Sequence, residues 1–188
     1  MAGLFIPHII LCGGFIFNNG RMVYNLIMVI VLDNIRSLFN VGSIFRTADA
    51  VGTKKIYICG ITPTPEDRFG RIRPQLAKVS LGAEKTVEWE YNKSTANVLC
   101  DLKKQKYKIF AVEQDKRSIP YYKLKLKKTD LEKVVLVFGN EVEGISKNIL
   151  KRADKVLEIP MAGKKESLNV SVSAGILMFG IKYLAIKK

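Results

Sequence analysis

The strongest constraint on this chain is a regular alternation between strand-like and helix-like segments that begins at Met28. Short apolar runs rich in β-branched and aromatic residues lie at 29–32, 55–59, 86–91, 108–112, 134–138 and 155–159. Segments with a helical spacing of apolar residues lie at 41–50, 76–81, 94–106, 145–152 and 168–186. This alternation predicts an α/β domain with a mainly parallel sheet and helices on both faces. A length of 188 residues is typical of one such domain.

The first 27 residues do not continue this pattern. The apolar stretch at 3–17 is too short to span a membrane. It also lacks the basic start of a signal peptide, because the first cation is Arg21. Pro7, Gly13 and Gly14 interrupt any helix or strand period there. We therefore predict a domain at 28–188, preceded by a poorly integrated extension or a mis-assigned start, and no membrane partner.

The net charge of +14, from 31 Lys and Arg against 17 Asp and Glu, favours an anionic partner, most simply a nucleic acid. A loop at 62–74 is rich in Pro and Gly, and its arginines, Arg68, Arg71 and Arg73, are candidate RNA contacts. The segment at 123–128 alternates lysine and leucine, as an edge strand with a basic face would. For both segments the alternative is a solvated surface without a partner.

The cysteines and the single histidine narrow the chemistry. Cys12, Cys59 and Cys100 show no paired spacing, so no zinc or redox motif is predicted and a reducing, cytoplasmic setting fits best. His8 is the only histidine, which argues against a histidine-based catalytic dyad and against a histidine-ligated metal. No metal ion is expected.

Two glycine-marked turns follow apolar runs near the C-terminal end of the chain. Their polar and glycine positions are Gly139, Glu141, Gly144, Ser167 and Asn169. Two such turns side by side would form a ligand crevice at the ends of parallel strands, where glycines let the backbone approach a ligand. Structural alternatives exist: Glu141 could match the dipole of the helix that follows it, and Ser167 could cap the last helix.

A third candidate segment follows the first strand. Asn40 is predicted to be the N-cap of the next helix, and Arg46 lies nearly two turns into that helix, between Phe45 and Ala48. The alternative for Arg46 is a surface arginine with an extended or salt-bridged side chain. The chain has no Gly-x-Gly-x-x-Gly after its first strand and no Gly-Lys-Ser/Thr loop, which disfavours an ordinary dinucleotide fold and a P-loop enzyme.

Together these segments resemble the SpoU (TrmH) family of the SPOUT RNA methyltransferases. Three motifs carry the resemblance and stand in the family's order: Asn-x-Gly-x-x-x-Arg at 40–46, Gly-x-Glu-x-x-Gly at 139–144, and Ile-Pro-Met with Ser-Leu-Asn-Val-Ser at 159–161 and 167–171. The similarity extends from about Met28 to Ile186. The individual motifs are short, but three in order, each in its strand context, make a specific signal.

The resemblance implies a deep C-terminal trefoil knot, bound S-adenosylmethionine, and methyl transfer to a ribose 2′-hydroxyl of tRNA or rRNA. By motif position, the residues implied to hold the cofactor, largely through backbone groups, are Val112, Gly139, Ile159, Met161 and Leu168. The residues implied to be catalytic are Asn40, Arg46, Glu141, Ser167 and Asn169. Two alternatives stay open: a non-catalytic RNA-binding protein, and a methyltransferase of this superfamily that acts on a base.

The resemblance also implies a homodimer. The segment at 168–186 is apolar around most of its circumference, and such a helix must be covered on more than one side. A partner subunit could supply part of that cover.

A protonated guanidinium limits the role of Arg46 in such a reaction. Because arginine stays charged, we expect Arg46 to bind a phosphate and to stabilise the developing alkoxide rather than to remove the proton. Glu141 would anchor Arg46 or a backbone amide, and the proton would leave through phosphate or water.

Overall fold

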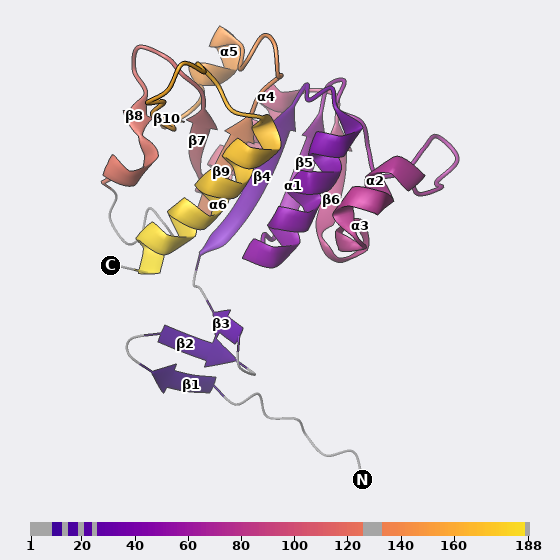
Figure 1. Cartoon of the computed structure of the whole chain (residues 1–188), viewed down its shortest axis with the longest axis horizontal. Coiled ribbons are helices and arrows are strands. Elements are labelled where there is room, and N and C mark those ends of the chain that lie inside the picture. Colours follow the sequence, from indigo (N-terminus) through magenta and orange to yellow (C-terminus); the bar gives the residue numbers. More distant parts are fainter. Residues whose placement is uncertain (1–8, 13–14, 19–20, 24–25, 126–132, 187–188) are drawn as a thin grey trace.

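A seven-stranded sheet forms the centre of the computed structural model, which describes residues 9–12, 15–18, 21–23, 26–125 and 133–186 (Figure 1). Its strands, in sheet order, are β6 (Glu88–Asn92), β5 (Lys55–Cys59), β4 (Ile27–Asp33), β9 (Lys133–Phe138), β7 (Lys108–Val112), β10 (Lys155–Glu158) and β8 (Ile119–Pro120). Every neighbouring pair is parallel, which confirms the predicted sheet. Each predicted run overlaps one of these strands, and within this sheet only the two-residue β8 was not predicted.

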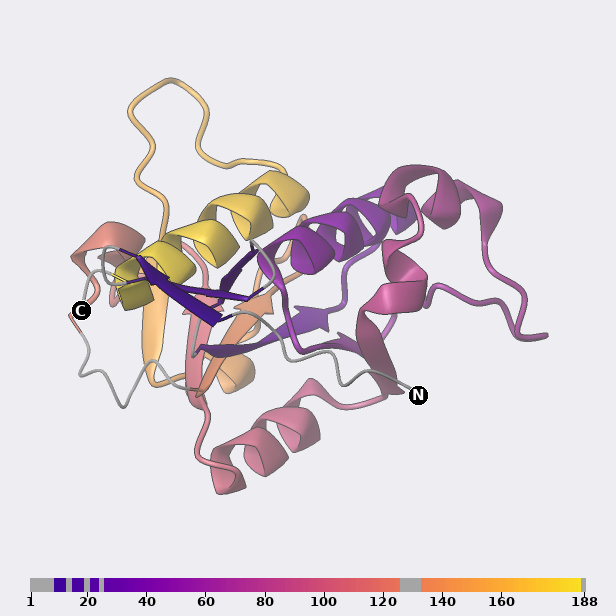
Figure 2. The same cartoon turned by 90° about the horizontal axis from the view of Figure 1, so that it is seen from below.

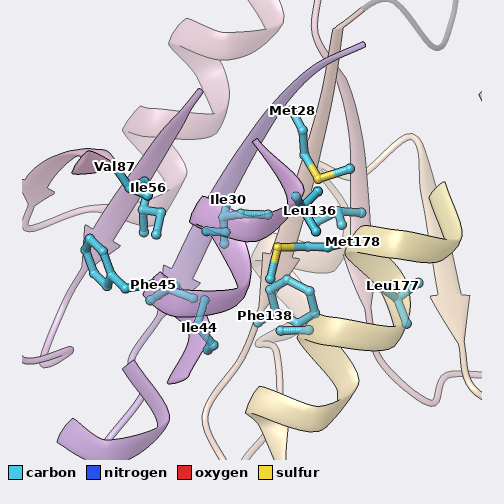
Figure 3. Close-up of a cluster of buried hydrophobic side chains, with 14 of the residues drawn as sticks. Met28, Ile30, Ile44, Phe45, Ile56, Val87, Leu136, Phe138, Leu177 and Met178 are labelled. Carbon is cyan, nitrogen blue, oxygen red and sulfur yellow. The ribbon is translucent and has the colours of Figure 1, made fainter. Parts of the chain in front are cut away.

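Both faces of the central strands are buried, in an alternating pattern. Met28 and Ile30 of β4 pack on one face with α1 (Leu38–Val51) and α6 (Val170–Ile186), in the cluster drawn in Figure 3. Val29 and Val31 point to the other face, where α4 (Thr95–Lys104) and α5 (Lys147–Leu150) cover them. Figure 2 shows this division, with α1 (purple) and α6 (yellow) opposite α4 (pink). Successive strand residues face opposite sides, so a near-continuous apolar run is what a doubly covered strand requires.

Helix α1 begins three residues earlier than the sequence pattern predicts. Its N-cap is Ser37, whose hydroxyl accepts the amide N–H of Asn40 at 3.3 Å, and it ends at Gly52, which has a φ of 73°. The prediction that Asn40 is the N-cap is therefore wrong, and the Asn40 side chain in the first turn is available for a different partner. Gly42 lies on the face that meets α2 (Pro74–Ser80), where an added Cβ would stand 3.0 Å from the carbonyl oxygen of Leu76.

Three further segments differ from the sequence prediction. Residues 9–23 include a three-stranded antiparallel sheet of β1 (Ile9–Cys12), β2 (Phe15–Asn18) and β3 (Arg21–Val23), although no strand period was predicted there. A short helix, α3 (Ala83–Thr86), occupies the start of the predicted strand at 86–91. The prediction of a basic edge strand at 123–128 is wrong for its first residues. Lys123 ends a 3-10 helix, η1 (Tyr121–Lys123), and Lys125 is in no strand. Residues 126–128 lie outside the described residues.

The chain order around β7 sets up the functional site. Strand β7 lies between β9 and β10, so the chain leaves β9, passes β7, and returns on its other side. The turns after β9 and β10 therefore flank the end of β7. The predicted knot and the predicted boundary at 28 stay predictions. In the part of the chain that the structure describes, none of the helices has the length and apolar character needed to cross a membrane.

Candidate active site

A cleft of about 660 Å³ opens at the C-terminal ends of β7, β9 and β10. Four segments line it: 112–114, 138–144, 157–161 and 166–173. The two glycine-marked turns thus lie side by side, as the parallel strand order predicts. The lining includes every residue expected to hold a cofactor, namely Val112, Gly139, Ile159, Met161 and Leu168. It also includes three of the expected catalytic residues, which are Glu141, Ser167 and Asn169.

The glycines of the β9 turn are required by the turn itself. A Cβ on Gly139 would stand 2.5 Å from Cγ1 of Ile145 and 2.7 Å from the carbonyl carbon of Gly144. Gly144 has a φ of 66°, and a Cβ there would meet the Glu113 carboxylate. That carboxylate accepts the amide N–H of Ile145 at 2.8 Å through Oε2 and the amide N–H of Gln114 at 2.9 Å through Oε1. Sequence reasoning missed Glu113, although it directly follows the expected cofactor residue Val112.

Asn140 is a second residue that sequence reasoning missed. Its Nδ2 donates to the carbonyl oxygen of Asn34 at 2.9 Å, which ties the turn to the end of β4. Its Oδ1 accepts the amide N–H of Val142 at 2.8 Å and that of Glu143 at 3.1 Å. Asparagine often holds a turn in this way, so its place inside the Gly-x-Glu-x-x-Gly motif was the available signal.

Glu141 reaches out of its turn to the N-terminus of α1. Its carboxylate accepts three hydrogen bonds: from the amide N–H of Arg36 at 2.9 Å, from the amide N–H of Ser37 at 3.2 Å and from Nδ2 of Asn40 at 2.9 Å. The prediction that Glu141 anchors a backbone amide is confirmed, whereas the alternative that it serves the following helix is wrong. Burial alone would raise the pKa of Glu141, but the donors from Arg36, Asn40 and Ser37 hold that pKa below its ordinary value.

Asn40 links Glu141 to the start of α6. Its Oδ1 accepts Nδ2 of Asn169 at 3.0 Å, and Oδ1 of Asn169 in turn accepts the amide N–H of Ser171 at 2.8 Å and its hydroxyl at 2.6 Å. The side chain that caps α6 is therefore Asn169, and the alternative that Ser167 caps this helix is wrong. Because Asn40 and Asn169 each donate through Nδ2 and accept through Oδ1, the orientations of both side-chain amides are fixed.

The comparisons with known proteins agree with this geometry. Residues 27–179 match the SpoU rRNA Methylase family. The chain belongs to this family. A tRNA (guanosine(18)-2′-O)-methyltransferase of Aquifex aeolicus is 32% identical over 152 residues, which are 81% of this chain and 67% of that protein. A 23S rRNA (guanosine-2′-O-)-methyltransferase RlmB of Ralstonia nicotianae is 32% identical over the same share of this chain but only 57% of its own length.

Solved structures show the same fold. The A. aeolicus TrmH/SpoU tRNA modifying enzyme is 29% identical, with a TM-score of 0.69 over 86% of this chain and 79% of that one. A putative RNA methyltransferase of the TrmH family from Porphyromonas gingivalis is 28% identical, with a TM-score of 0.71 over 86% of this chain and 61% of that one. This SpoU-family chain therefore spans between just over half and four fifths of these relatives.

Arg46 of the SpoU-family chain is exposed and is absent from the cleft-lining residues among those described. It lies six positions after Asn40, which places it about 120° away around the helix. It shares a face of α1 with Phe39, which lies seven residues earlier and is 54% exposed. The fold thus joins Asn40, Glu141 and Asn169 by hydrogen bonds, adds Ser167 to the lining, and leaves Arg46 on the outer surface of α1. Their catalytic roles stay predictions.

The predicted arginine loop is held by its own contacts. A bridge between Glu66 and Ile72 closes it, and Asp67 forms an ion pair with Arg71 at 3.0 Å. Arg68 and Arg71 lie over the exposed ring of Phe69, with guanidinium carbons 4.7 and 5.0 Å from its centroid. Arg73 instead donates through Nε to the carbonyl oxygen of Thr64 at 3.1 Å, which leaves it less available to a partner than Arg68. RNA contact by this loop stays a prediction.

Proposed function

We propose that this chain transfers a methyl group from S-adenosylmethionine to a ribose 2′-hydroxyl of tRNA or rRNA. One observation carries the proposal: the motif segments of Glu141 and Asn169, far apart in the sequence, line one cleft, and Asn40 of the third motif is joined to both side chains by hydrogen bonds. Membership of the SpoU family and relatives named as 2′-O-methyltransferases support it.

The cleft fits S-adenosylmethionine in size and lining. Its volume of about 660 Å³ lies within the range of small-molecule sites. Among the lining residues, the apolar side chains of Val112, Ile159 and Leu168 suit an adenine ring, and the turns at Gly139 and Met161 bring the backbone to the cleft wall. When bound, the cofactor supplies an electrophilic methyl group on a sulfonium. Among the described residues, no group of three or more His, Cys, Asp or Glu is placed to hold a metal ion.

The residues of the site divide into positioning and binding roles. The Glu141 carboxylate already accepts three hydrogen bonds and its pKa is lowered, so it is poorly suited to accept the proton of the ribose hydroxyl. We assign it the task of fixing α1 against the cofactor turn, and through Asn40 of fixing Asn169. The role of the Arg46 guanidinium is to bind the phosphate beside the acceptor ribose and to stabilise developing negative charge. The proton leaves to phosphate or water.

A labelled-methyl assay tests the proposed function. The protein is incubated with methyl-labelled S-adenosylmethionine and total RNA, and the RNA is digested to nucleosides. The expected product is a 2′-O-methyl nucleoside. A base-methylated nucleoside would show that the acceptor is wrong, and an absence of label together with retained RNA binding would support the non-catalytic alternative.

We also propose that the chain forms a homodimer through the outer face of α1 and α6. On α6, Val172, Phe179 and Tyr183 are 49%, 55% and 55% exposed and recur at spacings of seven and four residues, which puts them on one side of the helix. The two helices pack against each other (Figure 1), and α1 carries the exposed side chain of Phe39. Water-exposed aromatic side chains in such a row are typical of an interface. A second copy on this face would also lie within reach of Arg46.

The proposed compartment is the cytoplasm. The two described cysteines, Cys59 and Cys100, are free thiols, and Cys59 is fully buried. Free thiols are common where the surroundings are reducing. Non-reducing electrophoresis of protein alkylated in intact cells tests this, since a disulfide-linked species would argue against it.

A further inference from the structure

The cofactor cleft has an unusual charge for this protein. Four glutamates are among the residues that line it: Glu113, Glu141, Glu158 and Glu166. Among the lining residues that the structure describes, none is a lysine or arginine, although the chain carries 31 of these against 17 acidic residues. The cleft is therefore an anionic cavity in a molecule with a net charge of +14.

Three of the four carboxylates are held in place by the fold. Glu113 accepts the amide N–H groups of Ile145 and Gln114, and Glu141 is held by its three donors at the start of α1. Glu158 accepts the hydroxyl of Ser118 at 2.5 Å. The printed partners of these three carboxylates are amides and a hydroxyl. The fold thus fixes the positions of three of the four glutamate side chains of the lining.

Glu166 lies on the rim, and its backbone is fastened there. Nε2 of Gln114 donates to the carbonyl oxygen of Glu166 at 2.5 Å, which ties the segment before α6 to the end of β7. Its neighbours Lys164 and Lys165 are exposed and stand outside the lining. The acidic residue of this segment is therefore part of the cleft lining, while its two lysines are not.

The methyl-transfer reaction changes the charge of the molecule in such a cleft. The S–C bond breaks with its electron pair remaining on sulfur, the C–O bond forms, and the hydroxyl proton is released. The sulfonium thereby becomes a neutral thioether, and the donor with a net charge of +1 becomes a product with no net charge. A wall that carries negative charge stabilises the cationic donor more than the product with no net charge.

We propose that the four glutamates form a charge filter that favours S-adenosylmethionine over S-adenosylhomocysteine, so that spent cofactor is exchanged for fresh donor. This inference rests on the proposed function. A sphere with the 660 Å³ volume of the cleft is about 11 Å across, so a cation inside it lies within roughly that distance of every wall. At such distances in a partly solvated site, one carboxylate contributes roughly a fivefold preference for the cation.

Glu166→Gln is the sharpest perturbation, because this side chain is exposed and its backbone bond to Gln114 is retained. The matched control is Glu143→Gln, on the neighbouring turn, which removes the same charge outside the lining. Calorimetry measures the affinity of each protein for S-adenosylmethionine, S-adenosylhomocysteine and sinefungin, a non-reactive analogue with an amine cation in place of the sulfonium. Titrations are run at about 0.01 M and about 1 M salt, where the Debye length is roughly 30 and 3 Å.

At low salt, Glu166→Gln is expected to weaken both cationic ligands roughly fivefold and the neutral product less than twofold, and the loss shrinks at high salt. The control is expected to change none of the three more than twofold. Equal weakening of all three ligands would overturn the charge filter and indicate that Glu166 positions the ligand. A loss of affinity confined to S-adenosylmethionine, or no change in any affinity, would also overturn the charge filter. A wild-type chain that bound none of the three would refute the proposed function and the filter together.

Discussion

Replacing Glu141 by glutamine tests whether its carboxylate joins the β9 turn to α1. In the wild-type chain, Oε1 accepts from the Ser37 amide and from Nδ2 of Asn40, while Oε2 accepts from the Arg36 amide. Glutamine offers one acceptor oxygen and one NH₂ group, so at least one of these donors must face another donor. Turning the Asn40 amide would not help, because its Oδ1 is already needed by Asn169.

The magnitude follows from the number and the exposure of these bonds. A hydrogen bond to a charged group stabilises a fold by about 1.5–3 kcal/mol, but Glu141 is exposed, so water replaces part of any bond that is lost. We therefore expect Glu141→Gln to lower the free energy of unfolding by about 1 kcal/mol, and Glu141→Ala, which loses all three bonds, by about 2 kcal/mol. The matched control Glu143→Gln should stay within about 0.5 kcal/mol of the wild type.

Urea denaturation across a pH series provides the measurement. The pKa of Glu141 is lowered from its ordinary value of 4.5, so its contribution is fully present above that value and is lost as the pH falls through the lower pKa of the folded state. The stability difference between wild type and Glu141→Gln should therefore be largest at about pH 7 and shrink in acid. Equal stability of the two proteins at neutral pH, or a difference independent of pH, would refute the proposed role of the carboxylate.

Three further predictions concern RNA and assembly. Arg46→Ala should reduce turnover by at least about 100-fold while folding is retained, and near-normal turnover on bound RNA would remove Arg46 from the reaction. Joint replacement of Arg68, Arg71 and Arg73 by glutamine should weaken RNA binding. The slope of log affinity against log salt concentration should fall by about two rather than three, because Arg73 is turned toward Thr64. An unchanged slope would show that the loop does not contact RNA phosphates. Phe179→Asp should halve the mass measured by light scattering. A monomeric wild type, or an unchanged mass, would contradict the proposed dimer.

The crevice between the two turns could be predicted from the sequence because parallel strands share an edge. Apolar runs at 134–138 and 155–159 have to be strands, and in a parallel sheet their following turns emerge on the same side. The doubly covered sheet followed from the same runs, since a strand such as β4 has apolar residues on both faces. These inferences need only local patterns and the general geometry of sheets.

The partners of the polar side chains could not be predicted in this way. Asn40 was expected to cap α1, but Ser37 does so, and Asn40 instead bonds Glu141 and Asn169, which lie 101 and 129 residues further along the chain. Either residue type can cap a helix, and the choice depends on where the chain enters α1. Glu113 carried no local signal, because its importance comes from the space that Gly144 leaves open.

The sequence by itself determined the order of strands and helices, the glycine positions and the family, because these depend on hydrophobic periodicity and on short motifs. Only the tertiary structure decided which of the motif residues touch. It joined Glu141 to the start of α1, placed four glutamates around one cleft, and left Arg46 on an outer surface. The physical reason is that hydrogen bonds and charge–charge interactions act over a few ångströms in space. The packing of helices on the sheet sets the distance between such groups, and their separation in the chain does not.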